Sequence, residues 1–370
     1  MVRPDVTVLM TVYNGGRYLA PAVQSVLSQT FGDFEFLIVD DCSTDGSAAV
    51  IESFKDSRIF LHRNPENLGQ TKSLNAGLKL AKGPYIARID ADDWAFPRWL
   101  EIQHRFIVSH PQYVAVSAQA VIINSENRIV RKLASSSEPA DMVLKLFASV
   151  PINHGGVLMK KNRVLECGGY DEKYRVVADY DLWSRLVGRG HQLTSTADVL
   201  MAIRFHEASV SVTDRRTHVS EEMAEVVRRN FELLSGIAIG REDALLVEKI
   251  YYDGGSAEIG EFRRGLGLLE RAYGAVKKSF QVPRPAARRK FKALLRALCV
   301  KKIFAPGQSA EGVRQTARCY VERYGLLNIP FALLVVSYFG VFGVRALSAC
   351  HRLAGKFLMR LRLRKGSLVY

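Results

Sequence analysis

The 370-residue sequence predicts an α/β fold, with a mostly parallel sheet flanked by helices and a helical, basic C-terminal extension. Two observations predict this fold. Short apolar runs alternate with amphipathic stretches of helical spacing near the N-terminus, which is typical of a parallel sheet with right-handed crossovers. Polar and acidic residues follow several of the runs directly. The carboxyl ends of parallel strands share one edge, so we expect a ligand site there.

The expected elements alternate along the chain. Apolar runs predict strands, and the spacing of residues such as Leu19, Val23 and Val26 predicts helices. The expected strands are 6–10, 34–39, 58–62 and 85–89, and the expected helices are 17–29, 70–81, 220–234 and 242–252.

Three carboxylates, Asp90, Asp92 and Asp93, come directly after the fourth expected strand. Such a cluster is costly unless a positive group neutralises it. A divalent ion that carries a diphosphate would do so, and oxygen ligands suit Mg²⁺ or Mn²⁺. The alternative is a solvated acidic turn that caps the next helix. Two other expected strands deliver Tyr13 and Asp41 to the same edge, and this favours the ligand site.

This edge suits a nucleotide held through a metal. The sequence contains neither the phosphate-binding loop that ends in Gly-Lys-Ser/Thr nor the Gly-x-Gly-x-x-Gly fingerprint, so kinase and dehydrogenase interpretations lose their main support. Tyr13 could stack on a base, and Asp41 could accept a hydrogen bond from a base or ribose. The alternatives are that Tyr13 lies at the edge of the core and that Asp41 caps a helix.

Four segments in this order resemble successive signatures of the inverting GT-A glycosyltransferase family 2, which builds bacterial polysaccharides and cell-surface glycans. The segments are 6–14, 39–45, 67–78 and 86–93, and the similarity continues through 168–171 and 178–183. It covers about residues 4 to 215. The resemblance implies the GT-A nucleotide-diphospho-sugar transferase fold, which has a Rossmann-like sheet. It also implies a hexosyltransferase whose partners are a nucleotide-diphospho-sugar donor and a glycan or lipid-linked acceptor.

The resemblance also implies roles for single residues. Those that match positions contacting the nucleotide or the donor are Thr11, Tyr13, Asp41, Asn67, Gly69, Lys72, Arg88 and Asp90. Asp92 matches the aspartate that ligates the metal, and Asp93 either shares that role or caps the next helix. His206 resembles the closing segment near the diphosphate, and we expect it at the metal site. The implied cofactor is Mg²⁺ or Mn²⁺.

For catalysis, the resemblance implies a base on the acceptor side. Asp179 matches the aspartate of the family's Glu-Asp pair, and we expect it to deprotonate the acceptor hydroxyl in one displacement with inversion. The family commonly has Glu where this sequence has Ala178, so the contact of that Glu is missing or supplied elsewhere. Asp181 is the fallback base, and His154 is expected on the acceptor side. The alternatives are an ordinary helix start with acids in its first turn and a structural histidine.

All excess positive charge lies at the C-terminal end. Residues 281–370 contain 18 Lys and Arg but only 2 Asp and Glu, a net charge of +16, whereas the rest of the chain carries −1. Residues 326–344 are uncharged and mostly apolar, and basic residues alternate with Leu and Phe over 352–365. This mixture suits a helix in a membrane interface, while nucleic-acid binding would not need the apolar stretch. We therefore expect an anionic membrane surface, and no nucleic acid, as partner of 281–370. The alternative is a helix buried against the catalytic domain.

The expected domains are a catalytic domain over 1–219, a helical segment packed on it over 220–280, and the membrane-associating tail over 281–370. Pro283 and Pro285 suggest a linker over 281–289. The start of the chain leads directly into the first strand, and the five cysteines are spread widely, which predicts a cytoplasmic location. With the basic tail, we expect the protein at the cytoplasmic face of the cell membrane, as a peripheral or re-entrant protein.

Two other functions remain open at this point. A sugar-phosphate nucleotidyltransferase would share the acidic edge, but it would consume a nucleoside triphosphate and release pyrophosphate. A catalytically inactive, membrane-bound protein that holds a nucleotide is the other alternative, and the departure at Ala178 keeps it open.

Overall fold

The computed structural model describes residues 3–205, 219–253, 256–303, 311–313 and 315–316. The chain divides into two compact units. The first comprises residues 1–244 and 275–287, and the second comprises 245–274 and 288–370. The first unit contains the sheet and every described site residue that the sequence predicted.

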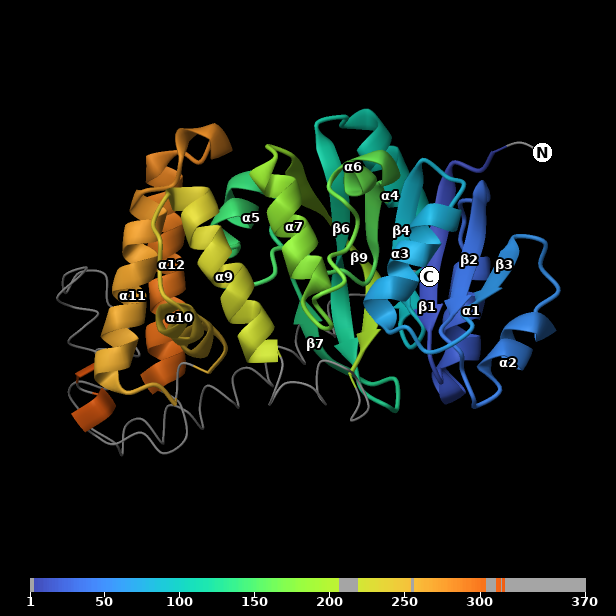
Figure 1. The fold of residues 1–370 in the computed structure, drawn as a ribbon, viewed down its shortest axis with the longest axis horizontal. Helices are drawn as coiled ribbons and strands as arrows, with labels where there is room; N and C mark the ends of the chain where they lie inside the picture. The colour runs from blue at the N-terminus through green and yellow to red at the C-terminus, as the bar shows by residue number, and fades with distance from the viewer. Residues whose placement is uncertain (1–2, 206–218, 254–255, 304–310, 314, 317–370) are drawn as a thin grey trace, which may run out of the picture. The chain divides into compact units, whose positions relative to one another are not determined.

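A nine-stranded sheet forms the centre of the first unit (Figure 1). Its order is β3-β2-β1-β4-β8-β6-β9-β5, and β7 pairs with β6. The parallel half consists of β1 (Val6–Val12), β2 (Phe34–Asp40), β3 (Ile59–Arg63) and β4 (Tyr85–Asp90). The other half contains β5 (Trp94–Ala95), β6 (Tyr113–Ile123), β7 (Ile129–Leu133), β8 (Val157–Lys160) and β9 (Gln192–Arg204). Strand β8 is antiparallel to both β4 and β6, whereas β6 and β9 are parallel.

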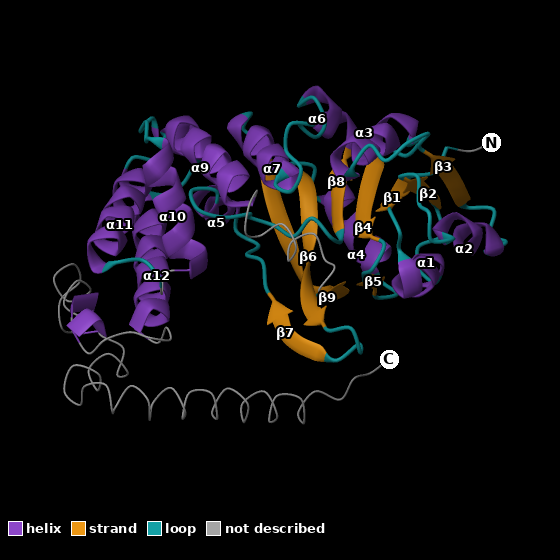
Figure 2. Cartoon of the chain, turned by 60° about the horizontal axis from the view of Figure 1, so that its bottom comes forward, coloured by secondary structure: helices purple, strands orange, loops and turns teal. Residues whose placement is uncertain are grey.

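Helices cover both faces of the parallel half (Figure 2). They are α1 (Leu19–Leu27), α2 (Ser47–Ser53) and α3 (Gln70–Leu80), and α4 (Trp99–Ser109) follows β5. Helix α1 connects β1 to β2, whereas α3 connects β3 to β4, which lies on the other side of β1 in the sheet. Because both crossovers are right-handed and run in opposite directions across the sheet, they place α1 and α3 on opposite faces. All seven residues of β1 and of β2 are buried as a result. This explains why these strands read as continuous apolar runs instead of alternating ones.

The strand order reverses between β1 and β4, and such a reversal leaves a crevice at the carboxyl ends of the strands. Thr11 pairs with Asp90 in the β1–β4 register, and Val12 pairs with Asp40 in the β1–β2 register. The predicted α/β fold is therefore confirmed. The predicted strands and helices are all present, with ends that differ by a few residues.

The first unit extends beyond residue 219, where the sequence suggested that the catalytic domain ends. It also contains η1 (Gly16–Tyr18), α5 (Pro139–Lys145), α6 (Lys161–Glu166), α7 (Ala178–Gly188), α9 (Val219–Ser235) and η2 (Lys278–Phe280). Helix α9 buries one apolar face, which includes Met223, Val227 and Phe231. It packs closely on α7, because a Cβ at Gly188 would lie 2.9 Å from a methyl group of Leu233.

The second unit is helical and contains most of α10 (Arg241–Asp253), together with α11 (Ile259–Gly274) and most of α12 (Arg284–Ile303). Gly265 lets α10 and α11 approach, since a Cβ there would lie 2.7 Å from Ile250 Cδ1. The predicted linker over 281–289 is wrong from Arg284 onward, where α12 begins. Pro285 lies in the first turn of that helix, where a missing backbone N–H breaks no helical hydrogen bond.

Within the described ranges, we find no helix that is both long enough and apolar enough to cross a membrane. The apolar stretch 326–344 and the basic stretch 352–365 lie outside those ranges.

Candidate active site

The acidic edge begins at the end of β4. Arg88 is 3% exposed, and its guanidinium group forms a two-pronged ion pair with the carboxylate of Asp90. Asp93 is buried, and its Oδ1 accepts a hydrogen bond from the backbone N–H of Arg204 at 2.9 Å. Arg204 Nε also donates to the backbone oxygen of Asp92 at 2.9 Å. The last strand of the sheet therefore fixes the acidic turn in place.

Asp93 has an unusual electrostatic environment. Its Oδ2 is buried and has no hydrogen-bond partner. Burial raises the pKa of Asp93 well above its usual range, and the negative charges of Asp90 and Asp92 raise it further. A cation beside this carboxylate would favour its charged form and so oppose the rise in its pKa.

Gly155 lies directly against the acidic turn. A Cβ at Gly155 would lie 2.9 Å from Asp93 Oδ2 and 3.6 Å from Asp90 Oδ2, so a larger residue would press on the two carboxylates. The described residues contain no set of three His, Cys, Asp or Glu side chains that could hold a metal by themselves. A divalent ion shared with a diphosphate needs only one or two carboxylates, and the residues present fit such an ion. His206 lies outside the described residues.

The expected nucleotide side consists of the loops that follow β1 and β2. Tyr13 is 53% exposed, directly after β1. The next residue, Asn14, accepts a hydrogen bond from the N–H of Thr44 at 2.8 Å, and Gly16 N–H donates to Asp45 at 2.9 Å. These two bonds fasten the loop that carries Tyr13 to the loop that follows β2. An exposed ring on a fixed loop suits base stacking because little conformational entropy is lost on binding.

Asp41 holds the third loop of this side. Its Oδ1 accepts hydrogen bonds from Asn64 Nδ2 at 2.7 Å and from Leu68 N–H at 2.9 Å, and its Oδ2 accepts one from Gly69 N–H at 2.8 Å. Gly69 has a φ of +87°, a conformation that favours glycine. A carboxylate has about four acceptor positions, so about one remains for a base or ribose donor.

The remaining predicted donor residues differ in exposure. Thr11 is buried at the end of β1, whereas Asn67 and Lys72 are exposed. Lys72 lies in the first turn of α3, which begins directly after Gly69. Gln70 Nε2 donates to Asp90 Oδ1 at 3.3 Å, and this contact links the start of α3 to the acidic edge.

Helix α3 also contacts the acceptor side. Thr71 donates a hydrogen bond to the backbone oxygen of Tyr174 at 2.8 Å. The Asn75 side-chain amide donates a hydrogen bond to the backbone oxygen of Tyr170 and accepts one from its backbone N–H, each at 2.9 Å. A Cβ at Gly169 would lie 2.8 Å from Asn75 Oδ1, so glycine is needed for this approach.

Asp179 lies in the first turn of α7 and is partly exposed. Its Oδ1 accepts a hydrogen bond from the N–H of Tyr180 at 2.8 Å. Burial raises the pKa of Asp179 to about 6, and the charges of Arg88 and Asp90 act on it in opposite directions. The expected base and the acidic edge therefore belong to one electrostatic cluster.

His154 and Tyr170 lie in the same cluster. His154 Nε2 and the Tyr170 hydroxyl are 2.8 Å apart, and the His154 ring meets Trp183 edge to face. Burial and the charge of Arg88 lower the pKa of His154 well below its usual value, so the ring is neutral near pH 7. A neutral ring that shares a hydrogen bond with a tyrosine can orient a hydroxyl group without adding charge.

Asp181 has a different environment from Asp179. It is 0% exposed, and its two oxygens are bound by Arg185 Nε at 2.7 Å and by Arg229 Nη1 at 2.6 Å. Both oxygens are occupied by guanidinium groups, which argues against Asp181 as the fallback base. Its observed role is to connect α7 with α9.

The sequence reasoning did not single out Tyr170, Arg204, Glu222 or Arg229 as site residues. Tyr170 was part of a recognised segment but had no assigned role. Glu222 and Arg229 follow at a spacing of two helical turns on the expected helix 220–234. This spacing places the two polar residues on one face of the helix beside apolar residues, and it is the sequence signal that could have found them.

Comparison with known proteins identifies the family. Residues 7–169 match the family model described as glycosyl transferase family 2. The protein EpsE of Bacillus subtilis (strain 168) is 34% identical over 207 residues, which cover 54% of this chain and 73% of EpsE. The chain belongs to glycosyl transferase family 2.

Other members of this family are also similar. The amylovoran biosynthesis glycosyltransferase AmsE of Erwinia amylovora is 31% identical over 207 residues, covering 54% of this chain and 75% of AmsE. The Escherichia coli UDP-Glc:alpha-D-GlcNAc-diphosphoundecaprenol beta-1,3-glucosyltransferase WfaP is 31% identical over 216 residues, covering 56% and 79%. The expectation of a glycosyltransferase is therefore confirmed.

Solved structures share the fold of this family 2 glycosyltransferase. S. aureus TarS 1-349 in complex with UDP-GlcNAc has a TM-score of 0.55 at 17% identity, covering 82% of this chain and 93% of that chain. The mannosyltransferase PcManGT from Pyrobaculum calidifontis, in complex with GDP-Man and Mn²⁺, has a TM-score of 0.51 at 20% identity, covering 82% and 88%. The predicted GT-A fold is confirmed. The matched family segment ends at residue 169, so Asp179 and α9 lie beyond it.

Proposed function

We propose that this glycosyltransferase moves a sugar from a nucleotide-diphosphate donor to a hydroxyl of a glycan or lipid-linked acceptor, with inversion, in surface polysaccharide biosynthesis. One observation carries the proposal. The partly exposed carboxylate of Asp179 lies within electrostatic reach of the Arg88–Asp90 pair, and burial raises its pKa to about 6. A base with such a pKa is largely deprotonated near pH 7 and still accepts a proton readily.

On the donor side, Tyr13 stacks on the base, and Asp41 accepts a hydrogen bond from the base or ribose. Lys72 and Arg88 supply positive charge near the donor. Asp92 and Asp93 would hold Mg²⁺ or Mn²⁺, which neutralises charge on the leaving diphosphate when bound. The buried, unpartnered Oδ2 of Asp93 and the absence of a side chain at Gly155, which lies beside it, support this assignment.

On the acceptor side, Asp179 takes the proton of the attacking hydroxyl. The acceptor oxygen forms a bond to the anomeric carbon as the bond from that carbon to the diphosphate oxygen breaks, and the nucleoside diphosphate leaves with the electron pair. His154, held by Tyr170, orients the acceptor hydroxyl. One displacement of this kind inverts the anomeric configuration.

The names of two relatives support the acceptor class. AmsE is named for amylovoran biosynthesis, and WfaP is named for an acceptor that carries diphosphoundecaprenol. These relatives are glycosyltransferases, which leaves the nucleotidyltransferase alternative without support from them.

The proposal can be tested with the full chain and a panel of UDP-sugars and GDP-sugars, the donor types bound in TarS and PcManGT. We expect nucleoside diphosphates to raise the melting temperature only when Mn²⁺ or Mg²⁺ is present. We expect Asp179→Asn to retain this stabilisation but to lose sugar transfer. If Asp179→Asn transferred sugar at the wild-type rate, the base assignment would be wrong. If no nucleotide stabilised the folded protein, the inactive alternative would have to be considered again.

We also propose that the basic C-terminal region docks on an anionic membrane surface at the cytoplasmic face. The described part of this region supports the proposal, since exposed basic residues crowd the first half of α12: Arg284, Arg288, Arg289, Lys290 and Lys292. Each basic residue near an anionic surface contributes about 1 kcal/mol of attraction. We expect the protein to sediment with vesicles of anionic lipid and not with neutral ones, and to be released by salt. Equal binding to both kinds of vesicle would contradict this proposal.

A further inference from the structure

We infer that Glu222, on α9, is a positioning residue for the transfer reaction because it holds the N-terminal end of α7, which carries Asp179. The inference rests on the proposed role of Asp179 as general base. It adds a residue from outside the matched family segment, which ends at 169.

The carboxylate of Glu222 binds three consecutive backbone amides. Arg175 N–H donates to Oε1 at 3.0 Å, while Val176 and Val177 N–H donate to Oε2 at 2.9 and 3.1 Å. These amides directly precede α7, which begins at Ala178. Val177 is the N-cap residue of α7, so its N–H is one of the amides that need an acceptor from outside the helix, and a negative charge at this end is favoured by the helix dipole.

Helix α7 has no local side chain for this task. Its N-cap residue is Val177, which has no polar side chain, and no side-chain cap hydrogen bond forms there. Ala178 also has no acceptor. Glu222 therefore caps the segment 175–177 that leads into α7, and it does so from a distant part of the sequence.

A second contact fixes α9 against α7 and so holds Glu222 in place. Arg229 lies two helical turns after Glu222 and binds the buried carboxylate of Asp181 at 2.6 Å. Asn230, the residue after Arg229 on α9, donates a hydrogen bond to the backbone oxygen of Leu146 at 2.8 Å. The hydroxyl of Tyr180, on α7, donates to the same oxygen at 2.6 Å. Helix α9 is thus joined to the start of α7 through Glu222 and to its first turn through Arg229.

The orientation of Asp179 depends on this cap. Its carboxylate bonds the N–H of Tyr180, a group of the same helix turn. The direction of the carboxylate therefore follows the backbone of the first turn. A displacement of about 1 Å in a reacting group can lower a rate by about 100-fold.

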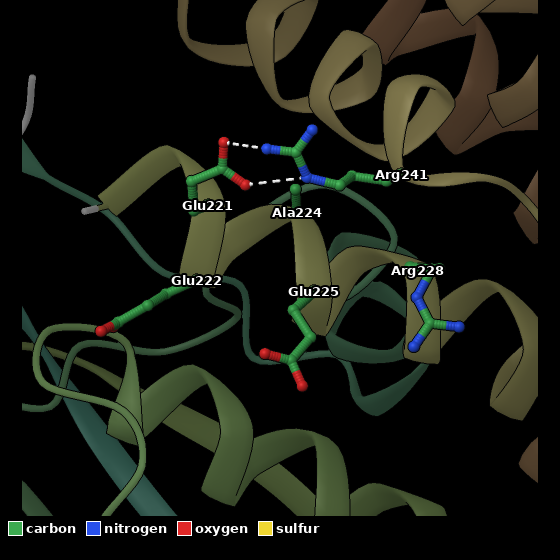
Figure 3. Close-up of a pocket in the computed structure, with 6 residues that line it drawn as sticks. All are labelled: Glu221, Glu222, Ala224, Glu225, Arg228 and Arg241. Carbon is green, nitrogen blue, oxygen red and sulfur yellow. Dashed lines mark hydrogen bonds and ion pairs between the residues drawn. The ribbon is translucent and has the colours of Figure 1, made fainter. Parts of the chain in front are cut away.

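Glu221 provides a matched control, one residue before Glu222. A cavity of about 310 Å³ is lined by Glu221, Glu222, Ala224, Glu225, Arg228 and Arg241. In Figure 3, Glu221 reaches Arg241, whereas Glu222 points away from this pair. Glu221→Gln removes the same charge from the same helix turn but leaves the amides of 175–177 capped.

The experiment compares Glu222→Gln, Glu222→Asp and Glu221→Gln in the full chain. Glutamine replaces one acceptor oxygen by a donor, so it cannot accept all three amides. We expect Glu222→Gln to lower kcat by about 10- to 100-fold while the donor KM stays within about two-fold, because the donor residues lie on other elements. Glu222→Asp keeps the carboxylate and should restore part of kcat. Glu221→Gln should resemble the wild type.

A double variant separates positioning from general stabilisation. If Glu222 acts through Asp179, then Glu222→Gln should lower the residual rate of Asp179→Asn by much less than it lowers the wild-type rate. An equal loss in both backgrounds, or an unchanged kcat with only a lower melting temperature, would overturn the inference. If Asp179→Asn itself retained full transfer, the proposed base would be wrong, and that outcome is distinct from a failure of Glu222 alone.

Discussion

Two aspartates of α7 should respond in opposite ways to the same substitution. Burial raises the pKa of Asp179 from its usual 3.8 to about 6, which means that the folded protein disfavours its charge. Asp181 instead forms ion pairs with two arginines. We expect Asp179→Asn to stabilise the fold while it abolishes transfer, and Asp181→Asn to destabilise the fold.

The size of the first effect follows from the shift in pKa. A group whose pKa is raised on folding contributes stability that is fully present below its unfolded value and is lost as pH rises through the folded value. For Asp179 the window runs from about 3.8 to about 6. At about 1.4 kcal/mol per pKa unit, Asp179→Asn should stabilise by up to about 3 kcal/mol above pH 7 and by roughly half of that at pH 5.

The second effect has the opposite sign. Asn at position 181 would leave two guanidinium groups without a counter-charge in a buried contact. Removal of one member of a buried ion pair costs on the order of 3 kcal/mol. Asn at position 179 preserves the acceptor oxygen for the N–H of Tyr180, so no such loss accompanies it.

Urea denaturation at pH 5, 6, 7 and 8 measures both variants against the wild type. The difference between Asp179→Asn and the wild type should grow between pH 5 and pH 7 and then stay constant. A destabilised Asp179→Asn at pH 8, or a difference that does not change with pH, would refute the reasoning about burial of this carboxylate.

Three further predictions concern the same site. The transfer rate should rise with pH up to about 6 and level off above 7, because the base must be deprotonated; a pH–rate profile checks this. Gly155→Ala should abolish metal-dependent stabilisation by nucleoside diphosphates, since its Cβ lies 2.9 Å from Asp93 Oδ2. The control is Gly32→Ala, where the new Cβ would meet nothing within 4 Å. It should leave this stabilisation unchanged, and thermal shifts compare the two variants. Asp41→Asn should destabilise by about 1 to 3 kcal/mol and raise the donor KM, as thermal unfolding and donor titration would show.

Much of the donor half could be predicted from the sequence. Strands β1, β2 and β4 are apolar runs that end in polar residues, and both signals are local. The parallel order then brings Thr11, Asp41 and Asp90 to one edge without any knowledge of side-chain contacts.

Contacts between distant segments could not be predicted in the same way. The contacts of Arg204 with the acidic turn and of Glu222 with residues 175–177 join segments that lie far apart in the sequence. Such contacts depend on tertiary packing, and no local pattern encodes them. Asp179 and Asp181 look alike in sequence, yet burial and Arg229 give them opposite environments.

The linker prediction failed for a related reason. Pro283 and Pro285 are typical of an irregular connection, but proline is also favoured in the first turn of a helix. The basic residues after Pro285 gave no sign of which of the two applied.

The contacts of α3 have a consequence for how related enzymes could be recombined. This helix starts at the donor loop, and its Thr71 and Asn75 bind backbone atoms of Tyr174 and Tyr170 on the acceptor side. A chimera could join the N-terminal half of one enzyme, which includes α3, to the C-terminal half of another. It would keep these hydrogen bonds only if a hydroxyl and an amide occupied positions 71 and 75. If the proposed division into donor and acceptor sides holds, acceptor specificity is therefore not a freely exchangeable module, because α3 anchors the segment 170–174 to the proposed donor side.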